Sequence, residues 1–422
     1  MQRRILLALV GTILASPAAF ADSANVTIGG NLRVGVDSYK LSQGNATSPN
    51  AAGYSNETRV DDQLSYIYFA GSEDLGGGLK AFFRLTTPIQ PDLGVLTGTG
   101  DSYAGFEGGF GKIYAGRLSV HYIEFVPIEV TRAGSLQNFL SMGPGLQVNG
   151  VGSASGFGGN SAYLFIPTRT ANIVVWDSPS FGGITARIAY STAPATNEGS
   201  GRNPNPASPT SVGTTGSKGS GEHFAIRYVT ADPLMGGISW WKATTEQNVT
   251  GQVANSVPPP TLNLNEKSTR AWVGYRFPFG LKVGLGYDKS EVIPGFGPIT
   301  LNDTLSFQKR TAYLLPLTYT AGAHNFYLTY LINGKTSGQV TPGINTHDDT
   351  GARAYMLGWD MALSKRTFFG VFYTKLDNDK NAAYSLFNTG VLSTAAGTST
   401  TSTVPNFGES ISQIWIGISH NF

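Results

Sequence analysis

Residue types that perform bond chemistry are few in this chain of 422 residues, and their spacing supports no catalytic site. The five histidines, at positions 121, 223, 324, 347 and 420, show no metal-ligand spacing, and there is no cysteine to supply a thiolate. No G-x-S-x-G nucleophile elbow lies beside a predicted strand-to-helix turn. Residues 213–221 look only faintly like a phosphate loop, because they lack the G-x-x-x-x-G-K-[ST] spacing. We therefore expect no enzyme, no metal site and no cofactor.

The N-terminus predicts the compartment. Residues 1–21 contain Arg3 and Arg4, an apolar run over 5–15 and Ala19-Phe20-Ala21, which is the pattern of a cleaved secretory signal. Cleavage leaves residues 22–422 with 27 basic and 27 acidic residues, since the signal carries two of the 29 bases and no acid. A neutral chain without a polybasic run gives no basis for nucleic-acid binding.

Composition favours a β-sheet wall over an ordinary soluble domain. Glycine occurs 54 times, aromatic residues make up 11% and charged residues only 13%, against about 25% charged residues in a typical soluble domain. Low charge with no long apolar block suits strands that alternate lipid-facing and water-facing residues.

Period-two alternation predicts sixteen strands. In residues 26–39, Val26, Ile28, Leu32 and Val34 share one face and polar residues the other; residues 60–71 and 79–87 follow as the next two strands. Long polar segments alternate with seven short connections, at 72–78, 108–109, 178–183, 230–236, 278–280, 320–324 and 362–366. This rhythm predicts an all-β, 16-stranded antiparallel transmembrane barrel with short periplasmic turns, long external loops and both termini at the short-turn end.

The C-terminal strand supports this prediction. Its alternate residues are large and mostly apolar, namely Ile414, Ile416, Ile418, His420 and Phe422. Alone, the segment fits equally an edge strand of a soluble sandwich; the signal and the turn rhythm favour the barrel. Aromatic residues near the short turns are expected to form an interfacial girdle: Trp176, Phe181, Trp240, Phe277, Phe279, Tyr319, Trp359 and Phe368.

One connection differs from the others. Residues 119–170 separate two strands by some fifty residues and contain the apolar patches 121–130 and 135–140. A long loop with its own apolar patches is usually functional and packs against something. In a barrel, the surface available to it is the inner wall, so we expect this loop to fold inward and narrow the lumen.

Several segments resemble the Gram-negative general porins of the β-proteobacterial type. They are residues 64–83, with the fairly specific Ser-Glu-Asp-Leu-Gly-Gly-Gly-Leu-Lys-Ala turn, and 109–117, 176–183, 363–367 and 417–422. The resemblance implies a trimeric sixteen-stranded barrel whose third external loop, here 119–170, enters the lumen. It further implies an outer-membrane location, contact with outer-membrane lipid and lipopolysaccharide, and recognition of the terminal strand, with Ile414, Ile416, Ile418, His420 and Phe422, by the outer-membrane assembly machinery.

The chain departs from the family pattern at several inward basic positions. Tyr66, Ala70, Ser102 and Ser419 stand at or beside positions where the family commonly has arginine. The acidic Pro-Glu-Phe-Gly element of many related loops is absent, and residues 155–159 are its nearest match. The family's anion preference is therefore not carried over to this chain.

A porin does no bond chemistry, and its narrowest point selects solutes by size and charge. The candidate constriction residues are acids and a base of the loop, Glu124, Glu129 and Arg132, and inward wall residues, Arg33, Arg84, Arg117, Tyr66 and Tyr68; Arg187, Arg227, Arg270 and Arg353 are further wall candidates. The expected function is passive diffusion of small hydrophilic solutes and ions. The alternatives are a specific channel for sugars or small aromatic or organic acids, favoured by the two tyrosines, and a non-conducting barrel with an enzymatic or adhesive role.

Overall fold

The computed structural model describes most strands and part of the loops. The described residues are 25–41, 56–61, 65–96, 100–134, 169–192, 194, 218–248, 261–296, 308–335, 337–338, 348–382, 408 and 410–422. The predicted signal (1–21) and residues 135–168 of the predicted inward loop lie outside this set.

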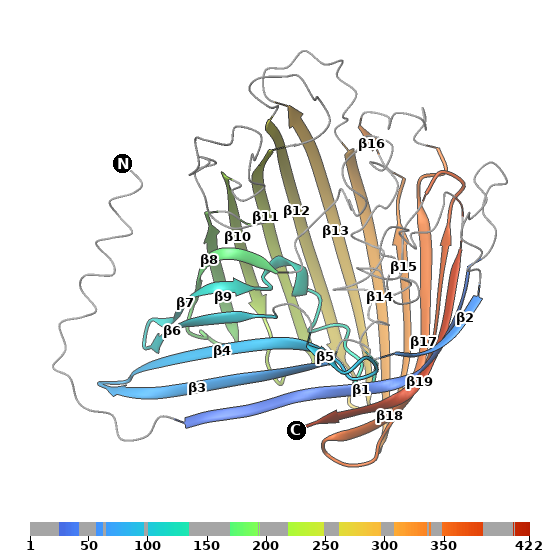
Figure 1. Cartoon of the computed structure of the whole chain (residues 1–422), viewed down its shortest axis with the longest axis horizontal. Helices are drawn as coiled ribbons and strands as arrows, with labels where there is room; N and C mark the ends of the chain where they lie inside the picture. The colour runs from blue at the N-terminus through green and yellow to red at the C-terminus, as the bar shows by residue number, and fades with distance from the viewer. Residues whose placement is uncertain are drawn as a thin grey trace.

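Sixteen strands close into one antiparallel barrel (Figure 1). In chain order they are β1 (Asn25–Leu41), β3 (Tyr66–Gly76), β4 (Leu79–Gln90), β6 (Ser102–Gly108), β7 (Gly111–Leu118), β8 (Thr170–Asp177), β9 (Ile184–Ser191), β10 (Lys218–Tyr228), β11 (Leu234–Asn248), β12 (Thr261–Arg276), β13 (Leu281–Phe296), β14 (Gln308–Ala321), β15 (His324–Asn333), β17 (Ala352–Ala362), β18 (Thr367–Asn378) and β19 (Ile411–Asn421). Short strands β2 (Asn56–Asp61), β5 (Val95–Leu96) and β16 (Ser337–Gly338) extend the pairing. The predicted sixteen-stranded antiparallel barrel is confirmed.

The seven predicted short turns each join two neighbouring strands, but some boundaries were wrong. Residues 72–78 were predicted as one turn, whereas β3 runs to Gly76 and only Gly77 and Gly78 connect it to β4. Both glycines have positive φ, at 61° and 80°, which side chains with a Cβ rarely adopt. The predicted strand 60–71 is likewise divided, since Asn56–Asp61 pairs with the upper part of β1 and Tyr66–Gly76 with its lower part.

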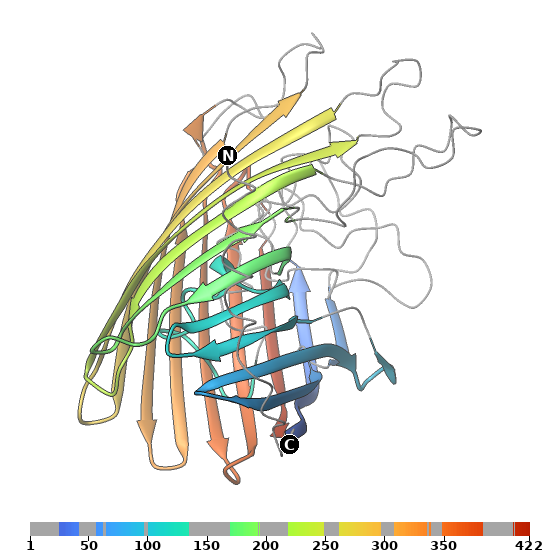
Figure 2. The same ribbon diagram turned by 90° about the vertical axis from the view of Figure 1, so that its left-hand side faces the viewer.

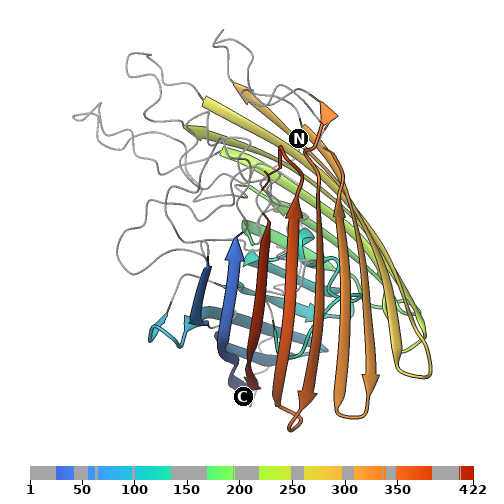
Figure 3. The ribbon, with the colours of Figure 1, turned by 90° about the vertical axis from the view of Figure 1, so that its right-hand side faces the viewer.

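The wall is unequal in height around the barrel. Strands β11, β12 and β13 have 15, 16 and 16 residues, whereas β6, β7, β8 and β9 have 7, 8, 8 and 8. We call the β10–β18 side the tall wall and the β3–β9 side the low wall. Figure 2 shows the short, inclined strands of the low wall in front of the longer ones, and Figure 3 shows the tall wall and the terminal strands from the other side.

The first and last strands close the barrel. β1 pairs with β19 from Asn31↔Asn421 to Leu41↔Ile411, and the C-terminus lies at the short-turn end (Figure 3). In β19, Ile414, Ile416 and Ile418 are exposed while Gln413 and Trp415 are buried. The predicted alternation of this strand is therefore present.

Large rings on the inner wall lie over glycines of their own or a neighbouring strand. A Cβ on Gly417 would come 2.3 Å from the Trp415 ring, and one on Gly35 2.6 Å from it. On the tall wall, a Cβ on Gly237 would come 2.7 Å from the Trp272 ring. Such distances are shorter than van der Waals contact, so these rings fit against the wall only because the glycines beneath them have no side chain.

Four of the predicted girdle aromatics are exposed and lie near the short turns: Phe181, Phe277, Phe279 and Tyr319. Trp240 is exposed too, but it lies in the middle of β11, away from the turn. Phe368 is an exception, because it packs against the inner cluster that contains Phe372 and Trp415. It pairs with buried Ser419, so the strand phase turns its ring inward and the girdle assignment was wrong for this residue.

Candidate functional site

Residues 119–134, which we call the strap, follow β7 and lie against the inner wall. The strap contains the 3-10 helix η1 (His121–Ile123). Its buried residues Val120, Phe125, Ile128 and Ala133 belong to the two apolar clusters of the inner wall. The described beginning of the predicted inward loop thus lies inside the barrel; residues 135–168 are outside the described set.

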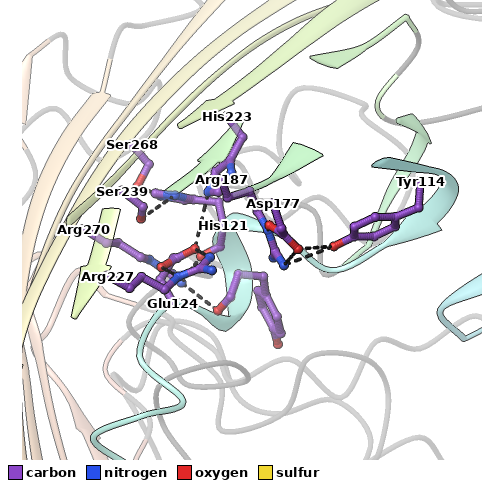
Figure 4. Close-up of polar contacts among 11 residues, drawn as sticks. Tyr114, His121, Glu124, Asp177, Arg187, His223, Arg227, Ser239, Ser268 and Arg270 are labelled. Atoms are coloured by element: carbon purple, nitrogen blue, oxygen red, sulfur yellow. Dashed lines mark hydrogen bonds and ion pairs between the residues drawn. The ribbon is translucent and has the colours of Figure 1, made fainter. Parts of the chain in front are cut away.

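Glu124 fixes the start of the strap to β10. Arg227 Nε donates to Glu124 Oε2 at 2.9 Å, and Arg227 Nη2 donates to Glu124 Oε1. His223 Nε2 lies 3.5 Å from Glu124 Oε1 (Figure 4). Burial raises the pKa of Glu124, but the hydrogen bonds from Arg227 and His223 outweigh it and lower the pKa to about 2. Glu124 is therefore an ionised, buried group at neutral pH.

His121 and Arg270 join the strap to β11 and β12. The two ring nitrogens of His121 lie 3.0 Å from Ser239 Oγ and 2.9 Å from Ser268 Oγ. Arg270, which is fully buried, donates to the backbone carbonyls of His121 and Tyr122 at 3.0 and 2.8 Å and to Asp288 of β13 at 2.9 Å. Burial, with Arg270 close by, lowers the pKa of His121 well below its usual value, so its imidazole is neutral.

Ile128 sits in a socket of glycines on β12 and β13. A Cβ on Gly274 would come 2.9 Å from Ile128 Cγ2, and one on Gly284 would come 2.8 Å from Ile128 Cβ. Gly286 lies beside the same side chain, and Ile128 itself is fully buried. The missing side chains of the wall leave the space that the strap fills.

The end of the described strap reaches β15, β17 and β18. Arg132 Nε donates to Asp360 Oδ1 at 2.7 Å, and Tyr327 Oη donates to Asp360 Oδ2 at 2.6 Å. The Arg132 guanidinium lies 5.2 Å from the centre of the Phe368 ring. Glu129 is buried and acts electrostatically on Lys282 of β13. The strap therefore crosses the tall wall from β10 to β18.

The low wall and the adjoining β1 carry the other predicted candidates. Arg84 of β4 lies 3.8 Å over the ring of Tyr68 on β3 and donates to Thr86 at 3.2 Å. Arg117 of β7 donates to the carbonyl of Gly100 at 3.3 Å. It pairs with Ser102 and shares the outward phase of exposed Ala115, so its predicted place on the lumen side was wrong. Arg33 of β1 shares the inward phase of Asp37; its N–H donates to Ser65 Oγ at 2.8 Å. Tyr66, in register with Asn31, is half-buried.

The structure thus brings Glu124 to Arg227 and Tyr68 to Arg84. The predicted loop acids and wall bases do not face one another across the lumen, because Glu124 contacts the wall directly beneath the strap. Arg353 is exposed beside buried Ala352 and Ala354 and lies on the outward phase, so its assignment to the lumen was wrong. Arg187 pairs with Asp177 at 2.6 Å within the low wall.

Sequence reasoning missed the acids of the wall. Asp288 and Asp360 are buried and bind Arg270 and Arg132, while Asp37 is buried and binds Arg59 at 2.8 Å and Gln413 at 2.6 Å. Each of these aspartates lies on the inward phase of its strand, and the alternation of inward and outward residues along the strand could have identified it. Among the residues that the structure describes, no group of three potential metal ligands occurs, and no helix is long and apolar enough to cross a membrane.

Known proteins resemble this chain over different extents. Major outer membrane protein P.IB of Neisseria gonorrhoeae is 32% identical over 202 residues, which cover 47% of this chain and 50% of that protein. The P.IB protein of Neisseria meningitidis serogroup B is 30% identical over 202 residues, covering 47% and 51%. The chain therefore matches about half the length of these relatives.

Two solved structures show the same fold at low identity. The anion-selective porin from Comamonas acidovorans superposes with a TM-score of 0.64 at 19% identity, covering 95% of this chain and all of that one. OmpT of Vibrio cholerae gives 0.58 at 11% identity, covering 96% and 100%. A family model described as Gram-negative porin matches residues 6–381, and the chain therefore belongs to the Gram-negative porin family.

Proposed function

We propose that this protein forms a water-filled channel in the bacterial outer membrane for passive diffusion of small hydrophilic solutes and ions. The observation that carries the proposal is a closed sixteen-stranded barrel with buried ion pairs on its inner wall and a strap held inside it. Family membership supports it. Such a channel selects solutes by shape and charge, so we assign no enzymatic reaction. The alternative is a non-conducting barrel with an enzymatic or adhesive role, and conductance measurements distinguish the two.

The strap, as the beginning of loop 119–170, is proposed to narrow this channel. Its anchoring pairs, Glu124–Arg227 and Arg132–Asp360, hold it against the tall wall. The low wall and the adjoining β1 then form the opposite side of the constriction, with Arg33, Arg84, Tyr66 and Tyr68. Because Glu124 and Glu129 are buried, we expect their charges to influence permeating ions less than those of the low wall.

The charge of the low wall supports a preference for anions. Arg84 of β4 lies on the inward phase and contacts the Tyr68 ring and Thr86 rather than an acid. Arg33 of the adjoining β1 also lies on the inward phase. The neighbour from Comamonas acidovorans is itself described as anion-selective.

Reversal potentials across a salt gradient in planar bilayers test this proposal. We expect measurable open-channel conductance and an anion-selective reversal potential in the wild type, shifted toward zero in Arg33→Gln/Arg84→Gln. Arg353→Gln, on the outward phase, is the matched control and should leave the potential unchanged. A cation-selective wild type would contradict the charge assignment, and the absence of conductance would contradict the channel.

A specific channel for small aromatic or organic acids is the second candidate. The observation that favours it is the Arg84 guanidinium 3.8 Å over the Tyr68 ring, since a cation beside an aromatic face can hold an aromatic carboxylate. Saturable block of the ion current by benzoate, lost in Tyr68→Leu, would support this reading. A linear dependence of flux on solute concentration for every solute tested would favour general diffusion.

Membership of the same family supports a proposal for the oligomeric state and the partners of the protein. We infer a homotrimer, supported by a solved trimer form of the neighbour OmpT, and contact with outer-membrane lipid and lipopolysaccharide. The terminal residues Ile414, Ile416, Ile418, His420 and Phe422 are proposed as the signal read by the assembly machinery.

A further inference from the structure

The pairing along one edge of β1 is interrupted at Arg33. On this edge β2 pairs with residues 35–40 of β1, and β3 pairs with residues 25–31. Within the described part of the chain, no strand residue pairs with residues 32–34 on this edge; we call these three positions the gap. Main-chain N–H and carbonyl groups that point into such a gap need other hydrogen-bond partners.

The main-chain groups of Arg33 point into the gap. On the opposite edge of β1, Gly30 exchanges two main-chain hydrogen bonds with Phe422, each of 3.2 Å. Successive residues of an antiparallel strand turn their main-chain groups to alternate edges. Arg33, three residues after Gly30, therefore directs its N–H and its carbonyl away from β19 and toward the edge where no strand residue pairs with it.

The side chain of Ser65 fills the hydrogen-bonding role of the missing strand residue. Ser65 is fully buried and directly precedes β3. Its hydroxyl accepts a hydrogen bond from the Arg33 N–H at 2.8 Å and donates one to the Arg33 carbonyl at 2.9 Å. The carbonyl of Ser65 accepts from the N–H of Ile89 in β4 at 2.9 Å. Ser65 is therefore held by β4 on one side and bridges both main-chain groups of Arg33 on the other.

The inward residues beside Arg33 on β1 and β19 are small. Ser419 lies directly opposite Arg33, and Gly35 and Gly417 face each other in the next inward pair. The ring of Trp415 lies over both glycines, since a Cβ on either would come within 2.6 Å of it. Small neighbours leave room around the stem of Arg33, so the orientation of the backbone at residue 33 sets the direction in which the side chain leaves the wall.

We propose that Ser65 is a positioning residue for Arg33, the inward arginine of β1. The proposal rests on the channel function above, in which Arg33 faces permeating ions. Ser65 acts through the backbone, because its hydroxyl is buried and engaged by residue 33. Without the hydroxyl, two main-chain groups lose their partner, which costs free energy unless lumen water enters and replaces it. Either change releases the backbone that directs the arginine into the lumen.

Reversal potentials across a salt gradient in planar bilayers test this role in the wild type, Ser65→Ala, Arg33→Gln and the double variant. We expect Ser65→Ala to move the potential toward zero by about half of the shift that Arg33→Gln produces. In the Arg33→Gln background it should produce no further shift, because a residue that acts through Arg33 has no effect without it. Ser419→Ala is the matched control and should leave the potential unchanged, since this buried serine accepts from Asn31 Nδ2 at 2.9 Å.

Amide hydrogen exchange of the full-length protein in detergent gives a second readout that does not depend on conduction. Protection of the Arg33 amide should fall about tenfold or more in Ser65→Ala and stay unchanged in Ser419→Ala. Unchanged protection, an unchanged potential in Ser65→Ala, or an equal shift with and without Arg33 would overturn the proposal. A wild type that does not conduct would contradict the channel, and the exchange result would still decide whether Ser65 holds residue 33.

Discussion

The ion pair between Glu124 and Arg227 is the residue-level contact that most directly links the strap to the wall. We expect Glu124→Gln to destabilise the folded protein by about 3 kcal/mol, because Arg227 would lose a buried charged partner. Denaturant unfolding in detergent measures this effect. Glu107→Gln is the control, because its pair with Lys112 is about half exposed and should change stability by less than about 1 kcal/mol. Equal effects would show that Glu124 is not an anchor.

The pH dependence of the strap follows from the same carboxylate. Its pKa of about 2 in the folded protein lies below that of an unfolded glutamate, about 4.3. The stabilisation is therefore complete above the unfolded value and is lost as pH falls toward the folded one. We expect the wild type to lose this contribution between about pH 4.3 and 2, and Glu124→Gln to lack that component of the acid transition. Identical acid titrations would contradict the assignment.

At the scale of elements, the strap depends on one side chain filling the glycine socket. We expect Ile128→Ala to destabilise the protein by about 2–4 kcal/mol and to raise single-channel conductance, because a loosened strap narrows the lumen less. Val126→Ala removes a side chain that is 40% exposed and serves as the control. An unchanged conductance in Ile128→Ala would show that this contact does not position the constriction.

Strands were predictable from sequence because, in a half-buried strand, residues of the buried face and of the exposed face alternate along the chain. This is why β19 and the seven turns were found. The contacts of the strap were not predictable, because His121, Glu124 and Ile128 meet β10–β13 about a hundred or more residues later in the chain. The prediction for Phe368 was wrong for a local reason. Its proximity to a turn suggested the girdle, whereas its strand phase, which it shares with Ser419, places the ring inside the barrel.

For the whole molecule, the terminal ring should matter to assembly. Phe422 is exposed, and its backbone N–H and carbonyl both hydrogen-bond Gly30 at 3.2 Å. We expect Phe422→Ala to reduce the amount of trimer in outer-membrane fractions several-fold while refolding in detergent is retained. Tyr319→Ala, which removes another exposed ring at the short-turn end, should leave trimer abundance unchanged. A normal trimer yield for Phe422→Ala would remove this residue from the assembly signal.

The seam between β1 and β19 also has a kinetic consequence. Its eleven pairs join residues separated by about 370 to 390 positions, from Leu41↔Ile411 to Asn31↔Asn421, so they are among the contacts of highest contact order in the chain. Contacts of this kind form slowly, since the entropy of closing so large a loop is lost before pairing compensates for it. Until they form, two strand edges stay open to other chains. In the closed seam, Trp415 packs across Gly35 and Gly417. The rate at which the seam closes therefore sets how long a newly exported chain remains vulnerable to aggregation.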